Sequence, residues 1–283
     1  MDIRNYFKSV VVSFSALALV VTPVAAAPER VPASVVNPHS QAVATVVIPP
    51  HAVELAPHVF SLGTARDIDG TIVEGYAFVH PRDEAVRPGS GGPARPGKST
   101  CYALLANGAR WQTTEPYLFN PVNADNLSAV VVEDALTASV EAWDTQVSFD
   151  VFGSGSATSG ILTAETSAPD GLNEVYFGDI ADSGTIAVTT VWGVFSGPTF
   201  NRRLVEWDMV FDDTDYLWGD ATSVPTVMDF QNIATHEVGH AVGLGHPADS
   251  CADETMYRFA SNGETKKRDL YTGDIAGIRK LYQ

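Results

Sequence analysis

Apolar side chains near the middle of the chain recur at the spacing of an α-helix. They lie four, four and three residues apart, at Val132, Leu136, Val140 and Trp143. This spacing places them on one face and predicts a helix packed against a core. Ser128 precedes the stripe and is expected to cap the free backbone N–H groups at the start of the helix. The helix needs no catalytic role to explain its pattern.

Two further helices are predicted in the C-terminal third of the chain. The first is expected to begin at Asp229, whose carboxylate suits an N-cap position. The second is expected to be capped by Thr272 and to end with the chain. Its buried face is predicted to contain Ile275, Ile278, Leu281 and Tyr282.

Shorter apolar runs with alternating or β-branched residues predict strands. The predicted strands cover residues 60–62, 71–79, 102–105, 111–119, 147–152, 173–177, 186–192 and 204–211. The first two flank a turn at Asp69-Gly70, which is typical of a hairpin. Strands mixed with a few helices indicate an α+β domain.

The first 27 residues have the pattern of a secretory signal peptide. Arg4 and Lys8 form a charged start, an apolar run covers residues 10–21, and three alanines at 25–27 offer a cleavage site. A membrane anchor is the alternative, but the run is short for a bilayer span and Pro23 follows it. We therefore expect a secreted, extracellular protein without a stable membrane anchor.

Residues 28–100 form an N-terminal extension or pro-segment in this interpretation. Their first half is rich in Ala, Val and Pro, and residues 88–96 hold a Gly/Pro-rich linker that is open to cleavage. Scattered histidines such as His58 and His80 are interpreted as solvated and are assigned no metal. The main folded domain is expected to cover residues 101–283.

The formal net charge is −17, with 17 Lys and Arg residues against 34 Asp and Glu residues. Nucleic-acid binding needs a basic footprint, so this composition argues against it. A protein or peptide is the expected partner, and a monomer is the expected state.

The chemistry of the chain is concentrated in the sequence HEVGHAVGLGH, from His236 to His246. His236 and His240 are four residues apart and lie on one face of a helix. Glu237 is offset by about 100° and can reach the edge of the same site. Gly243 allows a left-handed turn that returns His246 toward the pair. Three neutral ligands with an open fourth position describe a catalytic zinc site.

Two other interpretations of this cluster are weaker. A structural zinc would need a fourth Cys or His close by. A histidine cluster without metal would leave several buried nitrogens in need of partners.

This motif resembles the zinc motif of the metzincin metallopeptidases, in which a methionine-containing turn follows the ligands. Met256 stands ten residues after His246, and Tyr257 directly follows it, which is similar to the matrixin branch. The resemblance implies a metzincin-like fold with a mixed twisted sheet, a central active-site helix and a C-terminal helix. It also implies that Met256 has a structural role beneath the zinc and that Tyr257 shapes the substrate wall. Matrixins usually have proline where this chain has Arg258.

Two further segments resemble parts of matrixins. Residues 184–189 resemble the edge strand that binds substrate, which makes Ile186 and Ala187 substrate-wall candidates. Residues 208–215 resemble the strand and acidic loop before the active-site helix, and Asp212 and Asp215 match calcium-binding positions. A solvated acidic turn is the alternative there.

A second, structural zinc is not implied by the same comparison. Matrixins of animals usually contribute a histidine to that zinc from each of the two segments. This chain has Val188 and Val210 at those positions. We therefore expect one catalytic Zn²⁺, with Ca²⁺ as a further candidate cofactor.

The chain has two cysteines, Cys101 and Cys251. In an oxidising compartment a single disulfide between them is expected. The alternative is a cysteine switch, in which a pro-segment thiolate occupies the fourth zinc position. The sequence around Cys101 does not match the motif that matrixins use for that switch.

These patterns together predict a secreted zinc-dependent endopeptidase with Glu237 as general base. An inactive metzincin-like module that binds metal or a partner is the alternative, and it predicts zinc without turnover. A structural wall or surface protein is a third hypothesis, which absence of bound metal would favour.

Overall fold

The computed structural model describes residues 45–83 and 99–283, which fall within one compact unit of the chain. The predicted signal peptide at residues 1–27 and the Gly/Pro-rich linker at residues 88–96 lie outside the described residues. Within the described ranges, no helix is long and apolar enough to cross a bilayer.

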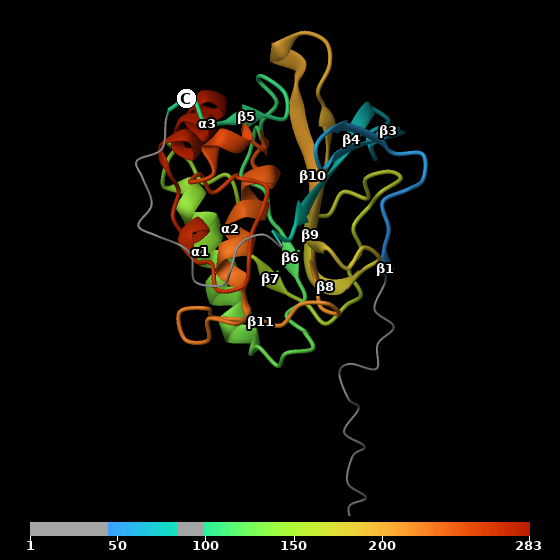
Figure 1. Ribbon diagram of the computed structural model, residues 1–283. Coiled ribbons are helices and arrows are strands. Elements are labelled where there is room, and N and C mark those ends of the chain that lie inside the picture. The colour runs from blue at the N-terminus through green and yellow to red at the C-terminus, as the bar shows by residue number, and fades with distance from the viewer. Residues whose placement is uncertain (1–44, 84–98) are drawn as a thin grey trace, which may run out of the picture. The chain divides into compact units, whose positions relative to one another are not determined.

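Nine of the described strands form one mixed sheet (Figure 1). Their order is β2-β3-β4-β9-β10-β8-β6-β7, and β1 pairs with β8. The central strand β10 runs antiparallel to β9 and parallel to β8, so the predicted mixed α+β sheet is confirmed. The strands are β1 (Thr45–Val46), β2 (Val53–Ala56), β3 (Val59–Arg66), β4 (Ile72–Pro81), β6 (Leu118–Phe119), β7 (Ser156–Ala157), β8 (Glu174–Ile180), β9 (Thr185–Val194) and β10 (Arg203–Asp212).

Three α-helices among the described residues lie on the same side of this sheet (Figure 1). They are α1 (Ala129–Asp144), α2 (Phe230–Ala241) and α3 (Thr272–Tyr282). Ser128 and Asp229 cap α1 and α2 as predicted, each accepting a hydrogen bond from a backbone N–H three residues later. For α3 the capping residue is Tyr271 instead of Thr272, because Asp274 reaches back to the N–H of Tyr271.

Short elements connect the main ones. The two-residue strands β5 (Ala103–Leu104) and β13 (Leu244–Gly245) pair with each other, as do β11 (Trp218–Gly219) and β12 (Met228–Asp229). The 3₁₀ turns are η2 (Thr199–Asn201), η3 (Asp249–Cys251) and η4 (Lys266–Arg268). The β5–β13 pair fixes the chain just after α2, where the third predicted zinc ligand follows.

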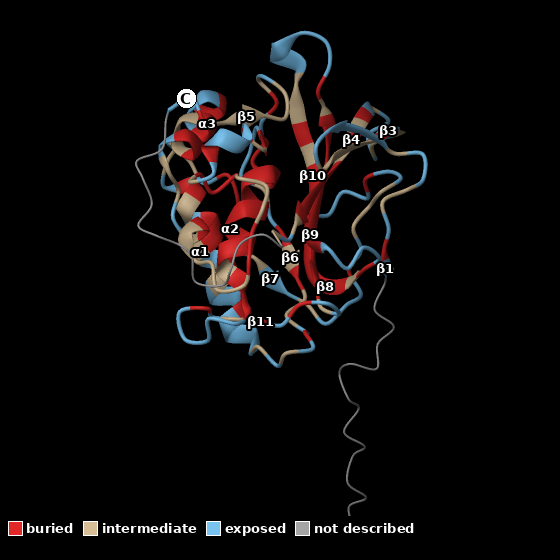
Figure 2. Cartoon of the chain, viewed as in Figure 1, coloured by how far each residue is buried: buried red, intermediate tan, exposed pale blue. Residues whose placement is uncertain are grey.

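The sheet separates two hydrophobic cores. Alternation along β4 shows this directly, because Phe78 packs on the helix side while Ala77 and Val79 belong to the core on the opposite side. α2 and the central strands β9 and β10 are buried along most of their length (Figure 2). The predicted metal motif on α2 therefore lies in a rigid interior.

Some predicted strands are wrong. Of residues 111–119 only Leu118–Phe119 is a strand, and residues 147–152 contribute a single bridge, between Phe152 and Glu115. The side chains of Trp111, Val151 and Phe152 are buried in the helix-side core, so their apolar pattern reflects burial without strand pairing.

The N-terminal strands pair with the rest of the sheet in a way that the sequence did not predict. Residues 59–66 and 72–81 form β3 and β4, close to the hairpin predicted around Asp69-Gly70. However, β4 pairs along the length of β9, whose other side pairs with β10. The expectation that residues 184–189 form an edge strand is therefore wrong for the described form, because β4 covers that edge.

Candidate metal centre

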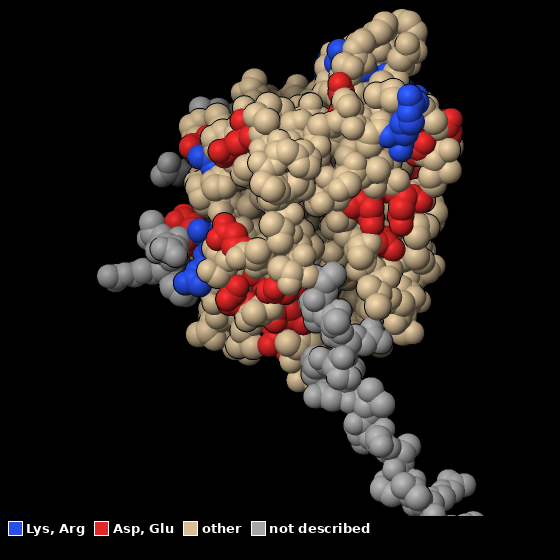
Figure 3. Space-filling view, turned by 90° about the vertical axis from the view of Figure 1, so that its right-hand side faces the viewer, with Lys and Arg blue, Asp and Glu red and all other residues tan. Residues whose placement is uncertain are grey.

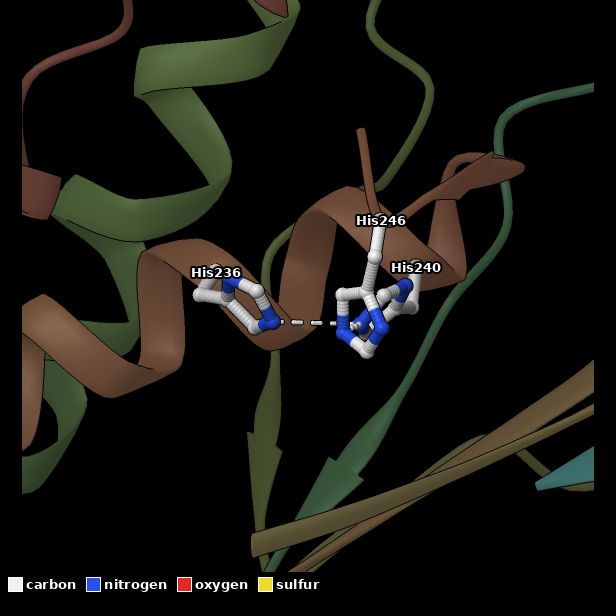
Figure 4. A group of neighbouring side chains, drawn as sticks. All are labelled: His236, His240 and His246. Carbon is white, nitrogen blue, oxygen red and sulfur yellow. Dashed lines mark hydrogen bonds between the residues drawn. The ribbon is translucent and has the colours of Figure 1, made fainter. Parts of the chain in front are cut away.

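Three histidines converge at the C-terminal end of α2 (Figure 4). His236 and His240 lie one turn apart on α2, which ends at Ala241. Gly243 has φ +103°, a left-handed conformation that residues with a Cβ rarely adopt. That turn and the following β13 bring His246 back to the same point, six residues beyond His240.

The three Nε2 atoms face one another. Nε2 of His240 lies 3.1 Å from Nε2 of His236 and 3.1 Å from Nε2 of His246. Ligands of a tetrahedral zinc at about 2.05 Å would be about 3.3 Å apart, so this donor set fits the ion closely. Among the described residues these atoms form one of the side-chain groups able to hold a metal.

Backbone carbonyls orient the rings of His236 and His240 for metal binding. The Nδ1 of His236 lies 2.6 Å from the carbonyl of Thr255, and the Nδ1 of His240 lies 2.9 Å from the carbonyl of Leu244. A carbonyl can only accept, so each Nδ1 carries the proton and each Nε2 keeps a lone pair for the metal. Burial lowers the pKa of all three histidines, for His240 to about 3, which keeps the rings neutral.

The carboxylate of Glu237 lies beside this cluster and is fully buried. The hydroxyl of Thr189, on β9, donates to its Oε2 at 2.6 Å. The Nδ1 of His80, on β4, lies 2.8 Å from its Oε1. Burial raises the pKa of Glu237 to about 8. A carboxyl group tuned in this way can accept and return a proton near neutral pH.

Met256 packs directly beneath α2. A Cβ added to Gly239, between the first two histidines, would lie 2.1 Å from the Met256 sulfur. The turn that carries Met256 is held by Asp274 of α3, which accepts the N–H groups of Thr255 at 2.7 Å and of Met256 at 3.1 Å. The methionine thus supports the floor of the site from a fixed position.

Comparison with known proteins agrees with this geometry. Residues 174–283 match the family model of the matrixin peptidases. The chain carries a matrixin-like peptidase domain. It is 41% identical over 70 residues to human matrilysin, which is 25% of this chain and 25% of that protein. It is also 43% identical over 75 residues to metalloendoproteinase 1 of Glycine max, covering 25% of this chain and 24% of the relative.

The chain thus spans about a quarter of the length of the curated relatives it matches. The matched region contains α2, the three histidines and the Met256 turn. The match of this region to the matrixin model implies zinc, and the three histidines could hold the ion.

A disulfide fastens the matrixin-like domain near its third histidine. Cys101 and Cys251 are bonded, with a sequence separation of 150 positions. Cys251 lies midway between His246 and Met256, so the bond ties the connecting loop to the segment before β5. With both cysteines bonded, neither thiol is free for a cysteine switch.

Strand β4 crosses the metal centre and adds a residue that the sequence interpretation missed. His80 is fully buried, contacts Glu237 and lies over the ring of His236, with the ring centroids 4.0 Å apart. Phe78, two residues earlier on the same face, stacks on His240 at 4.1 Å. The interpretation of His80 as a solvated loop histidine is therefore wrong. Its period-two spacing from Phe78 was the available signal.

Beyond the end of β4, the backbone of Arg82 and Asp83 is hydrogen-bonded on both sides. The N–H of Arg82 donates to the carbonyl of Gly184, just before β9. On the opposite side, the N–H of Asp83 donates to the carbonyl of Ala260, four residues after Met256. Residues 80–83 are thus held between β9 and the segment that follows the Met256 turn.

Lys267 is a second residue that the sequence did not reveal. It is fully buried, donates to the carbonyl of Tyr257, and its Nζ lies 3.3 Å from Nε2 of His80. Burial lowers the pKa of its ammonium group to about 7. Lys267 thus contacts His80, His236 and the backbone of Tyr257 beside the metal centre.

Asp212 and Asp215, the predicted calcium residues, do not form a cluster comparable to that of the three histidines. Asp212 is buried and its Oδ1 accepts the N–H groups of Thr214 and Asp215, whereas the Asp215 side chain is exposed. Within residues 45–83 and 99–283, no group of three close metal-binding side chains includes either of them.

Proposed function

We propose that this chain is a zinc-dependent endopeptidase that hydrolyses peptide bonds in extended protein segments. One observation carries the proposal. Three neutral imidazoles present their Nε2 atoms to one point, with the carboxylate of Glu237 next to them and a methionine turn beneath. The matrixin match supports the same conclusion, as do relatives named as metalloendoproteinases.

The residues divide the chemistry between them. When bound by His236, His240 and His246, zinc would supply the Lewis acidity for attack of water on a peptide carbonyl. Glu237 would take the proton from that water and pass it to the leaving amine. Thr189 holds one oxygen of Glu237 and leaves the other to point into the site once His80 has left.

We further propose that residues 28–100 act as a pro-segment that keeps the peptidase latent. The support is the position of β4, which adds a strand to β9 in the manner by which peptides add to open sheet edges. His80 contacts the carboxylate of Glu237, and residues 80–83 lie between β9 and the segment that follows Met256. Cleavage in the linker at 88–96 would allow this strand to leave.

We also propose that the protein is secreted. The N-terminal pattern of a signal peptide, the matrixin match and the disulfide between Cys101 and Cys251 all suit an oxidising extracellular compartment. There, extracellular-matrix and other proteins would be available as substrates, and the chain is proposed to act as a monomer.

A second candidate is an inactive matrixin-like module that binds metal or a partner. The contact between His80 and Glu237 favours it, because a base held by a permanent partner is unavailable for proton transfer. The two candidates differ in what happens when β4 is removed. A latent enzyme gains activity and an inactive module does not.

The test starts with the full secreted chain. We expect about one zinc per chain by elemental analysis, and little cleavage of a quenched peptide or casein until limited proteolysis cuts the linker before residue 99. Glu237→Gln should keep the zinc and lose the turnover. Zinc binding without turnover in the processed protein would support the inactive module, and processed Glu237→Gln with full activity would exclude the assigned base.

A further inference from the structure

Lys267 is a buried amine beside the metal centre, and the proposed chemistry gives it no role. It is 0% exposed, so it does not contribute to the surface charge in Figure 3, where Asp and Glu cover more of the visible face than Lys and Arg. Within residues 45–83 and 99–283, no Asp or Glu forms an ion pair with it. A buried N–H group needs a hydrogen-bond acceptor, so the contacts of its Nζ indicate what Lys267 binds.

The position of Lys267 is fixed by α2 and does not depend on β4. The backbone N–H of Lys267 donates to Oδ1 of Asn232, on α2, at 2.7 Å. The next residue, Arg268, donates from Nε to Oδ1 of Asp229, the N-cap of α2, at 2.8 Å. Asn232 and Asp229 are both completely buried. The helix that carries the metal motif therefore holds Lys267 in place when β4 is absent as well.

The Nζ of Lys267 has two hydrogen-bond acceptors in the described part of the chain. One is the carbonyl of Tyr257, and the other is Nε2 of His80, at 3.3 Å. The Nδ1 of His236 also lies 3.3 Å from Nζ, but it donates to the carbonyl of Thr255 and cannot accept. Departure of β4 would therefore remove one of the two acceptors and leave a buried N–H group unpaired.

The His80 side chain shows what a peptide paired with β9 would contact. β4 pairs with β9 as an antiparallel strand, with His80 opposite Ala187. The His80 ring lies over the ring of His236, with the centroids 4.0 Å apart, and its Nδ1 lies 2.8 Å from Oε1 of Glu237. Its Nε2 accepts from Lys267. A peptide that replaces β4 in the same direction and register would place one side chain against these three groups.

We propose that Lys267 selects the substrate residue that takes the place of His80, and that it favours glutamine there. This inference rests on the peptidase activity proposed above. The side-chain oxygen of glutamine lies as many bonds from Cα as Nε2 of histidine, so it can accept from Nζ in the same way. An apolar side chain of equal length would leave the buried N–H unsatisfied. Glutamate would bring a second carboxylate beside Glu237, which like-charge repulsion disfavours.

The preference does not depend on the charge of the amine. Neutral and protonated lysine both carry N–H donors, so an acceptor is favoured in either form. The position of the cut follows from Glu237, which passes a proton to the leaving amine in the proposed reaction. His80 is the residue of β4 whose side chain contacts Glu237. We therefore expect hydrolysis of the bond that precedes the selected residue.

The first experiment uses the zinc-loaded chain after the linker at 88–96 has been cut and the N-terminal fragment has dissociated. Two quenched peptides copy residues 75–82 and differ only at position 80, where one has glutamine and the other methionine. We expect kcat/KM to be at least about tenfold higher for the glutamine peptide. Lys267→Met should abolish this difference, whereas Lys280→Met, the same replacement at an exposed position of α3, should keep it.

The second experiment needs neither turnover nor a change at Lys267. In the uncut chain, His80→Gln keeps an acceptor for Nζ of Lys267, and His80→Met removes it. The Tm of His80→Met should therefore be about 2 to 4 °C lower than that of His80→Gln, the shift expected when one buried hydrogen bond is lost in a domain of this size.

The outcomes separate this inference from the peptidase activity itself. Equal cleavage of the two peptides, or a glutamine preference that Lys267→Met keeps, would agree with a peptidase but overturn the role of Lys267. Failure of the zinc-loaded chain to cleave either peptide would refute the peptidase activity and this inference with it. A Tm of His80→Met equal to or above that of His80→Gln would overturn the inference even if Lys267→Met does not fold.

Discussion

Replacement of Gly239 by alanine tests whether the close packing of α2 on the Met256 turn holds the metal centre together. Gly239 lies between His236 and His240 on α2. An added Cβ would lie 2.1 Å from the Met256 sulfur and 2.7 Å from Cζ2 of Trp143. Such distances are far below van der Waals contact, so the methionine, the tryptophan or the helix must move.

Two effects of opposite sign set the magnitude. Alanine is favoured over glycine inside a helix by about 1 kcal/mol, so helix propensity alone predicts a more stable protein. Overpacking a filled core costs about 1 to 3 kcal/mol, and both neighbours here are buried large side chains. We expect a net loss of up to about 2 kcal/mol of unfolding free energy. Displacement of the ligand helix should weaken zinc binding by about tenfold as well.

Urea denaturation followed by circular dichroism, together with zinc competition against a chromogenic chelator, measures both quantities. Gly245→Ala is the matched control, because its added Cβ would meet only Ala103, at an ordinary 3.7 Å. Adding Met256→Ala to Gly239→Ala should recover part of the loss, since the sulfur is the nearest obstacle. A Gly239→Ala protein that gains stability and keeps its zinc affinity would refute the packing argument.

Three further predictions concern other parts of the chain. Replacing Cys101 and Cys251 by serine opens a loop with a separation of 150 residues, so loop entropy predicts a loss of up to about 5 kcal/mol in urea denaturation; an unchanged midpoint would contradict it. His80→Ala should increase the peptidase activity of the uncleaved chain on a quenched peptide, because the carboxylate of Glu237 loses its partner, whereas unchanged latency would show that strand pairing alone closes the site. The free energy of unfolding should fall as the pH rises from about 4.5 to about 8, because burial raises the pKa of Glu206 from its ordinary 4.5 to about 8 in the folded chain, so the unfolded chain releases its proton first. Urea midpoints between pH 5 and pH 9 should show this fall, and Glu206→Gln should reduce it.

The features that the sequence predicted well depend on local patterns. The apolar stripe from Val132 to Trp143 and the caps at Ser128 and Asp229 were recognisable because helix formation depends on near neighbours. The turn at Gly243 follows the same logic, since only a few backbone conformations can reverse the chain after a helix.

The features that it missed depend on contacts between distant segments. His80 lies 157 positions before Glu237, and its spacing of two residues from Phe78 indicates the buried face of a strand but not the contact with Glu237. The buried carboxylates of Glu174 and Asp208 are far apart in sequence, and only the β8–β10 register brings them side by side. The false strand at 147–152 has the same origin, because burial against a core and pairing in a sheet produce similar apolar runs.

Because β4 and the edge of β9 that it covers belong to one polypeptide, dilution cannot separate them. A strand joined to its partner by a linker faces that edge at an effective concentration of about a millimolar, whatever the protein concentration in the sample. A peptide added at micromolar concentration would rarely displace it. An assay of the uncut chain would therefore give a low rate per enzyme molecule, and this rate would not change on dilution. A single backbone cut would change the rate, because β4 could then dissociate and would compete with the substrate like any other peptide.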